Sequence, residues 1–258
     1  MLSFAKALPD LRSHVAEQLE ASHELTRERV LACAVRLLDR GFFRIGTEEY
    51  TESNESFGLA TMRKEHVRLD GDAMVFDYPA KSGKRQVRAV VDPVAIEVVG
   101  KLKRRRGGGD ELLAFRQGRR WCDLRSDDVN EYIKDVTGAG YSAKDFRTWN
   151  ATVLAAVGLA VSGGVAGSKT GRKRAISRAV KEVAHYLGNT PAVCRASYID
   201  PRVFDAYEGG LTIRPALELA AEGPAGETAI HHQPALEKAV LDLIDERASA
   251  PGIERLAA

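Results

Sequence analysis

The 258-residue sequence has few of the residues that covalent crosslinks, metal clusters or membrane spans require. Its three cysteines, Cys33, Cys122 and Cys194, are too few and too scattered for a disulfide framework or a zinc site. The first residues lack an apolar core followed by a cleavage site, so we expect no signal peptide. Residues 148–168 carry no charge but are rich in Ala, Gly and Ser, which favours a buried helix and a loop over a membrane span.

The sequence also lacks the glycine-rich lysine loop that binds nucleotide phosphates. Its six histidines do not group with cysteines or carboxylates, and the pair His231 and His232 is expected to face solvent. We therefore expect no ATP site, no metal and no other cofactor.

The near-neutral net charge of +2 results from a cancellation. Residues 212–258 contain four basic and eight acidic side chains, a net charge of −4, which leaves +6 on residues 1–211. Basic side chains cluster at residues 101–106, and six more lie within residues 168–181 without an acid. A basic body with an acidic tail is typical of a protein that binds a polyanion. The alternative is that the basic runs are solvated loops.

The hydrophobic spacing predicts a mostly helical α+β fold. A helical pattern covers residues 10–40 and ends at Gly41. Between Phe57 and Val91 we expect a small three-stranded antiparallel sheet, because short β-rich runs there are separated by turn residues. The runs are residues 57–62, 66–69, 73–78 and 86–91, with a hairpin turn at Asp70-Gly71 and a basic turn at residues 81–84.

The rest of the chain is predicted to be mostly helical. The expected helices cover residues 127–136 after an N-cap at Ser126, residues 144–161, residues 174–187, a helix that starts at Thr190-Pro191 and carries Tyr198, and residues 235–247. Gly209-Gly210 is expected to end the compact region, and residues 223–226 are expected to be a linker. These features divide the chain into a main domain, residues 1–211, and an acidic extension with an amphipathic helix, residues 212–258.

Five polar residues are the candidates for chemistry, namely Arg44, Lys81, Arg147, Asn189 and Tyr198. Each has a structural explanation when it is taken singly. An arginine at a helix end forms salt bridges, an asparagine after a helix tolerates the left-handed conformation, and a tyrosine ring packs in a core with its hydroxyl at the surface.

Taken together, the motifs around these residues resemble the catalytic domain of type IB DNA topoisomerases, most closely the small bacterial and poxvirus-like branch. The motifs are RIGTEEY at residues 44–50, the hairpin lysine at 81, KDFRTW at residues 144–149 and LGNTPAVCRASY at residues 187–198. The last motif is long and specific, whereas the hairpin lysine alone would be weak evidence for the resemblance. The resemblance covers roughly residues 1–211 and implies the breaking-rejoining fold that these enzymes share with tyrosine recombinases.

The resemblance implies an isomerase that relaxes supercoiled double-stranded DNA by transient cleavage of one strand, rotation and religation, without ATP or metal. Tyr198 would be the nucleophile and would form a 3′-phosphotyrosyl link. Arg44 and Arg147 would hold the nonbridging oxygens, for which a planar guanidinium is well suited. Lys81 would protonate the leaving 5′-oxygen, and Asn189 would donate a hydrogen bond to a nonbridging oxygen.

The sequence departs from the family pattern at two positions. Many members have histidine where this chain has Asn189, and asparagine cannot act as an acid or base there. The family commonly has glycine where Ala80 precedes the hairpin lysine, so Lys84 is an alternative to Lys81 as the general acid.

We expect DNA to lie across the face that carries Lys81, Arg147 and Tyr198. The expected phosphate contacts are Lys84, Arg85, Lys144, Lys169, Arg172, Lys173 and Arg174. The resemblance further implies a bacterial, cytoplasmic and nucleoid-associated monomer. The opening of the chain resembles the start of the family's catalytic domain, so we expect the N-terminal lobe that closes around DNA to be absent.

Two other functions remain open at this point. A tyrosine recombinase shares the fold and much of the residue set, although it usually carries His-x-x-Arg where this chain has Lys144 and Arg147. A non-catalytic DNA-binding protein would also need the basic residues, because phosphate affinity does not require a nucleophile.

Overall fold

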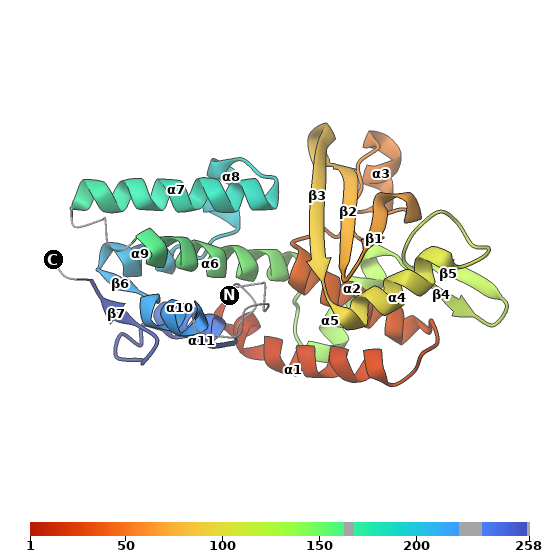
Figure 1. The fold of residues 1–258 in the computed structure, drawn as a ribbon, viewed down its shortest axis with the longest axis horizontal. Coiled ribbons are helices and arrows are strands. Elements are labelled where there is room, and N and C mark those ends of the chain that lie inside the picture. Colours follow the sequence, from red (N-terminus) through yellow and green to blue (C-terminus); the bar gives the residue numbers. More distant parts are fainter. Residues whose placement is uncertain (163–167, 222–233, 257–258) are drawn as a thin grey trace. The chain divides into compact units, whose positions relative to one another are not determined.

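The computed structural model describes residues 1–162, 168–221 and 234–256 (Figure 1). Within these ranges the chain forms two compact units. The N-terminal unit comprises Ala7–Arg147, and the C-terminal unit comprises Met1–Lys6 and Thr148–Ala258. Both units are mostly helical with short antiparallel strands, which confirms the predicted α+β class.

The sheet predicted between residues 57 and 91 is present in the N-terminal unit, with three antiparallel strands in the order β1-β2-β3. Its strands are β1 Val67–Asp70, β2 Ala73–Ala80 and β3 Lys84–Val91. Side chains on β2 alternate between a buried face, which includes Met74, Phe76 and Tyr78, and a more exposed face. The 3-10 turn Lys81–Gly83 joins β2 to β3, and its last residue is left-handed (φ 67°).

Residues 57–62 do not form a strand, so that prediction is wrong. Leu59, Ala60 and Met62 are buried, but the backbone follows a loop that bonds mainly to the segment after α2 and does not form a strand of the sheet. The N–H of Leu59 donates to the carbonyl of Arg44 at 2.8 Å, and that of Ala60 donates to the carbonyl of Ile45 at 2.7 Å. A short apolar run alone could not distinguish these two outcomes.

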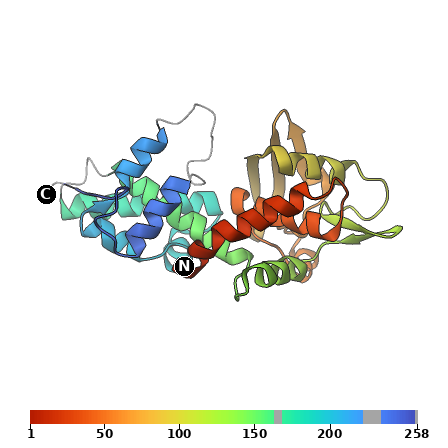
Figure 2. The ribbon, with the colours of Figure 1, turned by 90° about the horizontal axis from the view of Figure 1, so that it is seen from below.

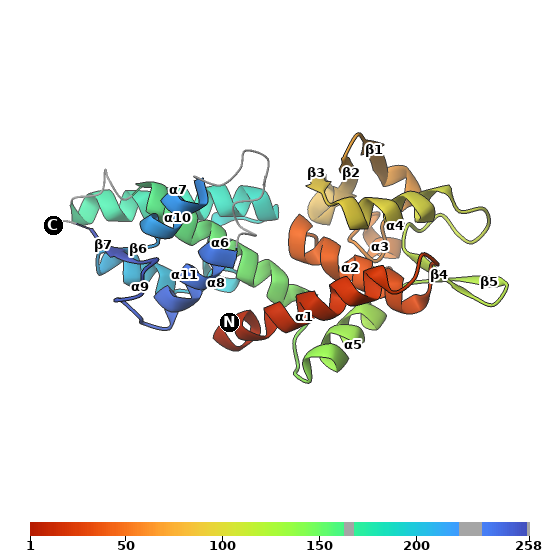
Figure 3. The ribbon, with the colours of Figure 1, turned by 60° about the horizontal axis from the view of Figure 1, so that its bottom comes forward.

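Helices make up most of the rest of the N-terminal unit. Those that lie wholly or partly in the N-terminal unit are α1 Leu2–Glu20, α2 Arg27–Gly41, α3 Glu48–Asn54, α4 Pro93–Arg104, α5 Ser126–Thr137 and α6 Ala143–Ser162. The start of α1 and most of α6 belong to the C-terminal unit. The central helix is α2, because it packs against α4, α5 and β3 (Figure 3).

The single helical region expected at residues 10–40 is two helices, so the prediction of one continuous helix is wrong. The chain breaks between α1 and α2, where the side chain of Ser22 accepts a hydrogen bond from the N–H of Glu24 at 3.0 Å. Thr26 then caps α2 by accepting from the N–H of Arg29 at 3.2 Å. Such local side-chain bonds compete with a continuous helix.

The buried carboxylate of Asp92 joins α2 to α4. Its Oδ1 accepts hydrogen bonds from two N–H groups in the first turn of α4, at 3.1 and 2.9 Å. Its Oδ2 lies 2.6 Å from Nε of Arg36 and 3.0 Å from Nε of Arg40, both on α2. Beside it, burial and then the charge of Asp92 raise the pKa of the Cys33 thiol to about 12, so this cysteine is a packing residue.

Lys101, Lys103 and Arg105 of the basic run at residues 101–106 bond to backbone carbonyls of the fold, so these three side chains have a structural role. Nζ of Lys101 donates to the carbonyl of His23 at 2.8 Å. Arg105 is buried, and its guanidinium donates to the carbonyl of Leu112 at 2.9 Å. The sequence did not reveal the hairpin that follows, which is formed by β4 Ala114–Gln117 and β5 Arg120–Asp123.

The remaining elements belong to the C-terminal unit. They are α7 Lys169–Leu187, α8 Pro191–Ser197, α9 Arg202–Glu208, β6 Leu211–Thr212, α10 Arg214–Ala221, α11 Pro234–Ile244 and β7 Glu254–Arg255. The predicted helices at residues 144–161, 174–187 and 235–247 are confirmed as α6, α7 and α11. The predicted helix at residues 127–136 is confirmed as α5, which starts at Ser126 and takes Arg125 as its N-cap.

The end of the chain packs into the C-terminal unit. There, β6 pairs with β7, and α11 packs against α9 and α10 (Figure 2). Nε of Arg214 at the start of α10 lies 3.0 Å from Oε1 of Glu254 on β7. The contacts therefore divide the chain at residue 147, and the catalytic-domain boundary at residue 211 stays a prediction. The expected linker at residues 223–226 and the pair His231 and His232 lie outside the described residues.

Replacing Asp92 with alanine is expected to lower the free energy of unfolding by about 3–5 kcal/mol, because two arginines and a helix N-terminus lose one shared acceptor. Urea unfolding followed by circular dichroism measures this loss. Asp70→Ala is the control, since Asp70 pairs with Arg68 where both side chains are exposed, and a change below about 1 kcal/mol is expected. Equal losses in the two variants would contradict the role of Asp92.

Candidate functional site

Arg147 is held against the segment that carries Arg44. Arg147 lies on α6 with only 4% of its surface exposed, and its Nη1 donates to the carbonyl oxygen of Phe42. Phe42 follows α2 directly and has a left-handed backbone (φ 56°), which is uncommon for a residue other than glycine. Two residues later, Arg44 is half-buried. The guanidinium of Arg147 is therefore held by the same short stretch of backbone that carries Arg44.

The loop at residues 56–60 ties the Arg44 segment to the base of the lysine turn. Besides the bonds to Arg44 and Ile45 given above, the N–H of Phe57 donates to the carbonyl of Pro79 at 2.8 Å, near the end of β2. Gly58 permits this close approach, because a Cβ there would lie 2.3 Å from the backbone nitrogen of Gly46. The sequence suggested a strand here, and the structure instead gives a connection between two candidate site segments.

Lys81 begins the 3-10 turn at the tip of the β2–β3 hairpin and is exposed. Lys84, the alternative general acid, begins β3 and is also exposed. Arg85 is exposed but is held by Asp77, with Nε 2.6 Å from Oδ1 and Nη2 bonded to Oδ2. Lys144 is exposed near the start of α6.

Tyr78 marks the point where the cationic groups of the N-terminal unit converge. Burial raises the pKa of its phenol, while the positive charges of Arg88, Arg147 and Arg44 act in the opposite direction. The ring packs on Phe43 with 6.3 Å between centroids, and Phe43 in turn meets Phe76 at 4.8 Å. The charges of three arginines thus act on a phenol whose ring belongs to an aromatic cluster.

Sequence reasoning missed Arg88 as a member of this group. The missed signal was the alternation along residues 84–91, which places Arg88 opposite Phe76 on the buried face of the sheet. A charged residue at a position that alternation assigns to the core is unusual, because burial of a charge is unfavourable unless it has a function or a partner.

In the C-terminal unit, Asn189 and Tyr198 stand at the two ends of α8. Gly188 ends α7 in the left-handed conformation (φ 64°), and Thr190 caps α8 with Pro191 in its first turn, as predicted. Asn189 lies between these caps and is half-buried. Helix α8 ends at Ser197, so Tyr198 is its C-cap and not one of its helical residues.

The backbone after Tyr198 is fixed by buried groups. The N–H of Asp200 donates to Oγ1 of Thr152 on α6 at 3.1 Å. Burial acts to raise the pKa of Asp200, but hydrogen bonds from Arg202 outweigh burial and hold that pKa below its ordinary value. The carboxylate is therefore ionised at neutral pH, and its bidentate pair with Arg202 braces the turn that follows Tyr198.

The basic stretch at residues 168–181 is mainly helical, which rules out the alternative that it is a solvated loop. Ser168 caps α7 by accepting from the N–H of Gly171 at 3.0 Å. The predicted phosphate contacts Lys169, Lys173 and Arg174 are exposed on α7. Arg172 differs from them, because it is half-buried and its Nη1 donates to the carbonyl of Glu208 at 2.7 Å.

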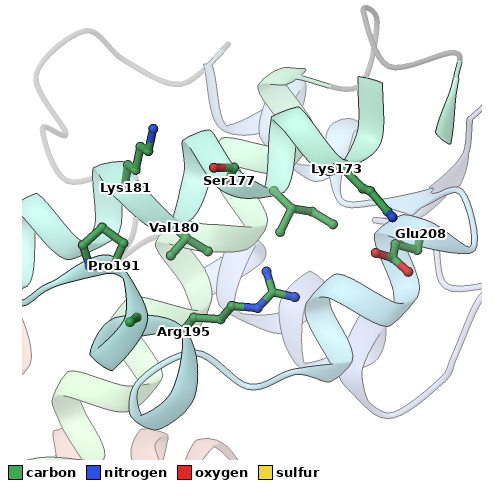
Figure 4. A pocket seen from close by; sticks show the side chains of 9 residues that line it. Lys173, Ser177, Val180, Lys181, Pro191, Arg195 and Glu208 are labelled. Atoms are coloured by element: carbon green, nitrogen blue, oxygen red, sulfur yellow. The ribbon is translucent and has the colours of Figure 1, made fainter. Parts of the chain in front are cut away.

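A cavity of about 430 Å³ lies between α7, α8 and the end of α9 (Figure 4). Its apolar part includes Ile176 and Val180, and its cationic part includes Lys173, Lys181 and Arg195. The guanidinium of Arg195 points into the cavity, 4.5 Å from the ring centre of Phe204. The cavity therefore adds Lys181 and Arg195 to the cationic surface of α7.

In the part of the chain that the structure describes, no group of three or more His, Cys, Asp or Glu side chains is arranged to hold a metal ion. Among the described helices, none combines the length and apolar character of a membrane span.

Comparison with known proteins identifies the family. The family model for the catalytic core of eukaryotic DNA topoisomerase I matches residues 1–213. The chain belongs to this family. The matched range includes all five candidate residues, from Arg44 to Tyr198.

The relatives within the topoisomerase I family are viral and eukaryotic. DNA topoisomerase 1B of Acanthamoeba polyphaga mimivirus is 24% identical over 215 residues, which cover 81% of this chain and 63% of the viral protein. DNA topoisomerase 1 of Schizosaccharomyces pombe is 31% identical over 147 residues, which cover 56% of this chain and 17% of the yeast protein. The chain thus spans less than two thirds of these relatives. Its likeness to a bacterial branch stays a prediction.

Gly58→Ala tests the connection between the candidate site segments. The added methyl group meets the Gly46 backbone, so we expect the loop to shift, with a loss of about 1–3 kcal/mol in stability and, for the DNA cleavage proposed below, a rate at least tenfold lower. Thermal unfolding and a single-turnover cleavage assay measure the two effects. Gly140→Ala is the control, because a Cβ there meets nothing within 4 Å. Unchanged cleavage in Gly58→Ala would contradict the positioning role of the loop.

Proposed function

We propose that this chain relaxes supercoiled double-stranded DNA through a transient 3′-phosphotyrosyl intermediate, without ATP or metal. The observation that carries the proposal is the bond that holds Arg147 two residues away from Arg44, at the two positions where the motifs imply a phosphate clamp. Membership of the topoisomerase I family supports the same activity.

In the proposed reaction, Oη of Tyr198 attacks the scissile phosphorus. A P–Oη bond forms and the P–O5′ bond breaks, while the phenol loses its proton and the 5′-oxygen gains one. Because one phosphoester replaces another, the bond energy is retained for religation, and ATP is not needed. The cut strand rotates about the intact strand before the 5′-hydroxyl attacks the phosphotyrosine and reverses the step.

The assignment of roles follows from charge. The pentacoordinate phosphorus carries more negative charge on its nonbridging oxygens than the starting diester does, so fixed cations stabilise it preferentially. Arg44 and Arg147 supply those cations, and Asn189 donates a neutral hydrogen bond. Lys81 delivers the proton to the 5′-oxygen from the exposed hairpin tip, a position from which it can approach a bound duplex.

Relaxation of a supercoiled plasmid in EDTA and without ATP tests this proposal. We expect a ladder of topoisomers from the wild-type chain, and a loss of at least about 10³-fold in Tyr198→Phe, because the phenylalanine ring lacks the nucleophilic oxygen. A covalent protein–DNA adduct, trapped with denaturant, is expected from wild type and not from the variant.

The assay also separates the other candidate functions. Strand exchange that depends on a partner site, without topoisomer ladders, would indicate a recombinase. DNA binding without any covalent adduct would indicate a non-catalytic DNA-binding protein. Either outcome overturns the proposal.

We further propose that the exposed cations of α7 bind DNA phosphates. In the double variant Lys173→Gln/Arg174→Gln, the plot of log affinity against log salt concentration is expected to lose about 0.9 in slope for each phosphate contact removed. Binding to a fixed duplex between about 50 and 200 mM salt measures this slope. Arg119→Gln/Arg120→Gln removes the same charge from an exposed hairpin and is expected to leave the slope nearly unchanged. Equal changes would overturn the assignment.

A further inference from the structure

Arg88 is a charged residue on the inner face of the sheet formed by β1, β2 and β3, where its neighbours on β2 are apolar or aromatic. The pairing of β2 with β3 sets Met74 opposite Val90, Phe76 opposite Arg88 and Tyr78 opposite Gln86. Directly opposed residues point to the same side of an antiparallel pair. Arg88 therefore shares a face with the buried rings of Phe76 and Tyr78, and it is half-buried itself.

The guanidinium of Arg88 is oriented by its neighbour two residues earlier. Its Nη2 donates to Oε1 of Gln86 at 2.9 Å, on the same face of β3. The other charged residues of this hairpin lie differently, since Arg85 is on the exposed face and is bound by Asp77. Arg88 is thus directed inward where Arg85 is directed outward.

The surroundings of Tyr78 place Arg88 in the same group as the two clamp arginines. The ring of Tyr78 contacts Phe43, the residue between the Phe42 carbonyl that binds Arg147 and Arg44 itself. The positive charges of Arg88, Arg147 and Arg44 all act to lower the pKa of the Tyr78 phenol, against the effect of its burial. Three arginines from a strand, a helix and a loop therefore converge on one aromatic cluster.

We propose that Arg88 is a third cation of the phosphate site, which stabilises the negative charge that develops on the scissile group. This inference rests on the proposed function. Unlike the two clamp arginines, Arg88 belongs to none of the motifs that carry the family resemblance. It is distinguished by its position on the inner face of β3. Its contribution is electrostatic, and it adds to the charge that Arg44 and Arg147 supply.

The test compares a charged with a neutral scissile group. A suicide duplex is made with either a phosphodiester or a methylphosphonate at the position that the wild-type chain cleaves, because the methyl group removes the negative charge of one nonbridging oxygen. On the phosphodiester, single-turnover cleavage by Arg88→Gln is expected to be about 10–100-fold slower than wild type. On the methylphosphonate, the same variant is expected to be within about threefold of wild type, because less charge remains to be stabilised.

Two further variants separate charge from packing. Arg88→Lys keeps a cation. On the phosphodiester, it is expected to recover at least half of the decrease in the logarithm of the cleavage rate that Arg88→Gln causes. Arg68→Gln is the matched control, since Arg68 lies on β1 of the same sheet and pairs with Asp70 in solvent, and it is expected to cleave both substrates at the wild-type rate.

Each outcome decides the inference. An equal loss on both substrates by Arg88→Gln would assign Arg88 to folding, and a loss below twofold would remove it from the site. Either result overturns the inference and leaves the topoisomerase activity standing. The absence of a covalent adduct from the wild-type chain with both substrates would overturn the proposed function and this inference together.

Discussion

The hydrogen bond from Arg147 to the carbonyl of Phe42 is the contact on which the candidate phosphate site depends. It joins a buried side chain of α6 to the left-handed residue that ends α2, and so fixes the direction in which the chain leaves that helix. Arg44 follows two residues later, and Phe43 between them packs on the sheet that presents Tyr78 and Arg88. A charged group used for catalysis must be held rigidly, since electrostatic stabilisation depends on preorganised geometry.

The supporting contacts are mostly backbone contacts. The loop at residues 56–60 forms hydrogen bonds with the Arg44 segment on one side and with the end of β2 on the other. The same loop therefore positions both Arg44 and the base of the Lys81 turn. In the C-terminal unit, α8 is bounded by the caps at Gly188 and Thr190 and by the turn that Asp200 braces. Side chains offered to a ligand are thus supported by main-chain hydrogen bonds that do not depend on the ligand.

The sequence predicted the elements that have strong local signals. The Asp70-Gly71 turn, the Gly188 stop and the Thr190-Pro191 start are determined by their own residues, and all three are present. The course of residues 57–62 depends on backbone bonds to residues distant in sequence, which hydrophobic periodicity cannot reveal. The break between α1 and α2 and the role of Arg105 depend on bonds between polar groups near in sequence, which the spacing of apolar residues does not register either. Arg88 was not predicted as a site residue, because its importance depends on the face of the sheet on which it lies, opposite Phe76.

The most direct test of the account is the identity of the nucleophile. A suicide duplex traps the covalent adduct, and mass spectrometry of the digested protein identifies the modified residue and the DNA end attached to it. The account predicts a 3′-phosphoryl DNA end joined to Oη of Tyr198. An adduct at another side chain, or a 5′-phosphoryl attachment, would contradict it.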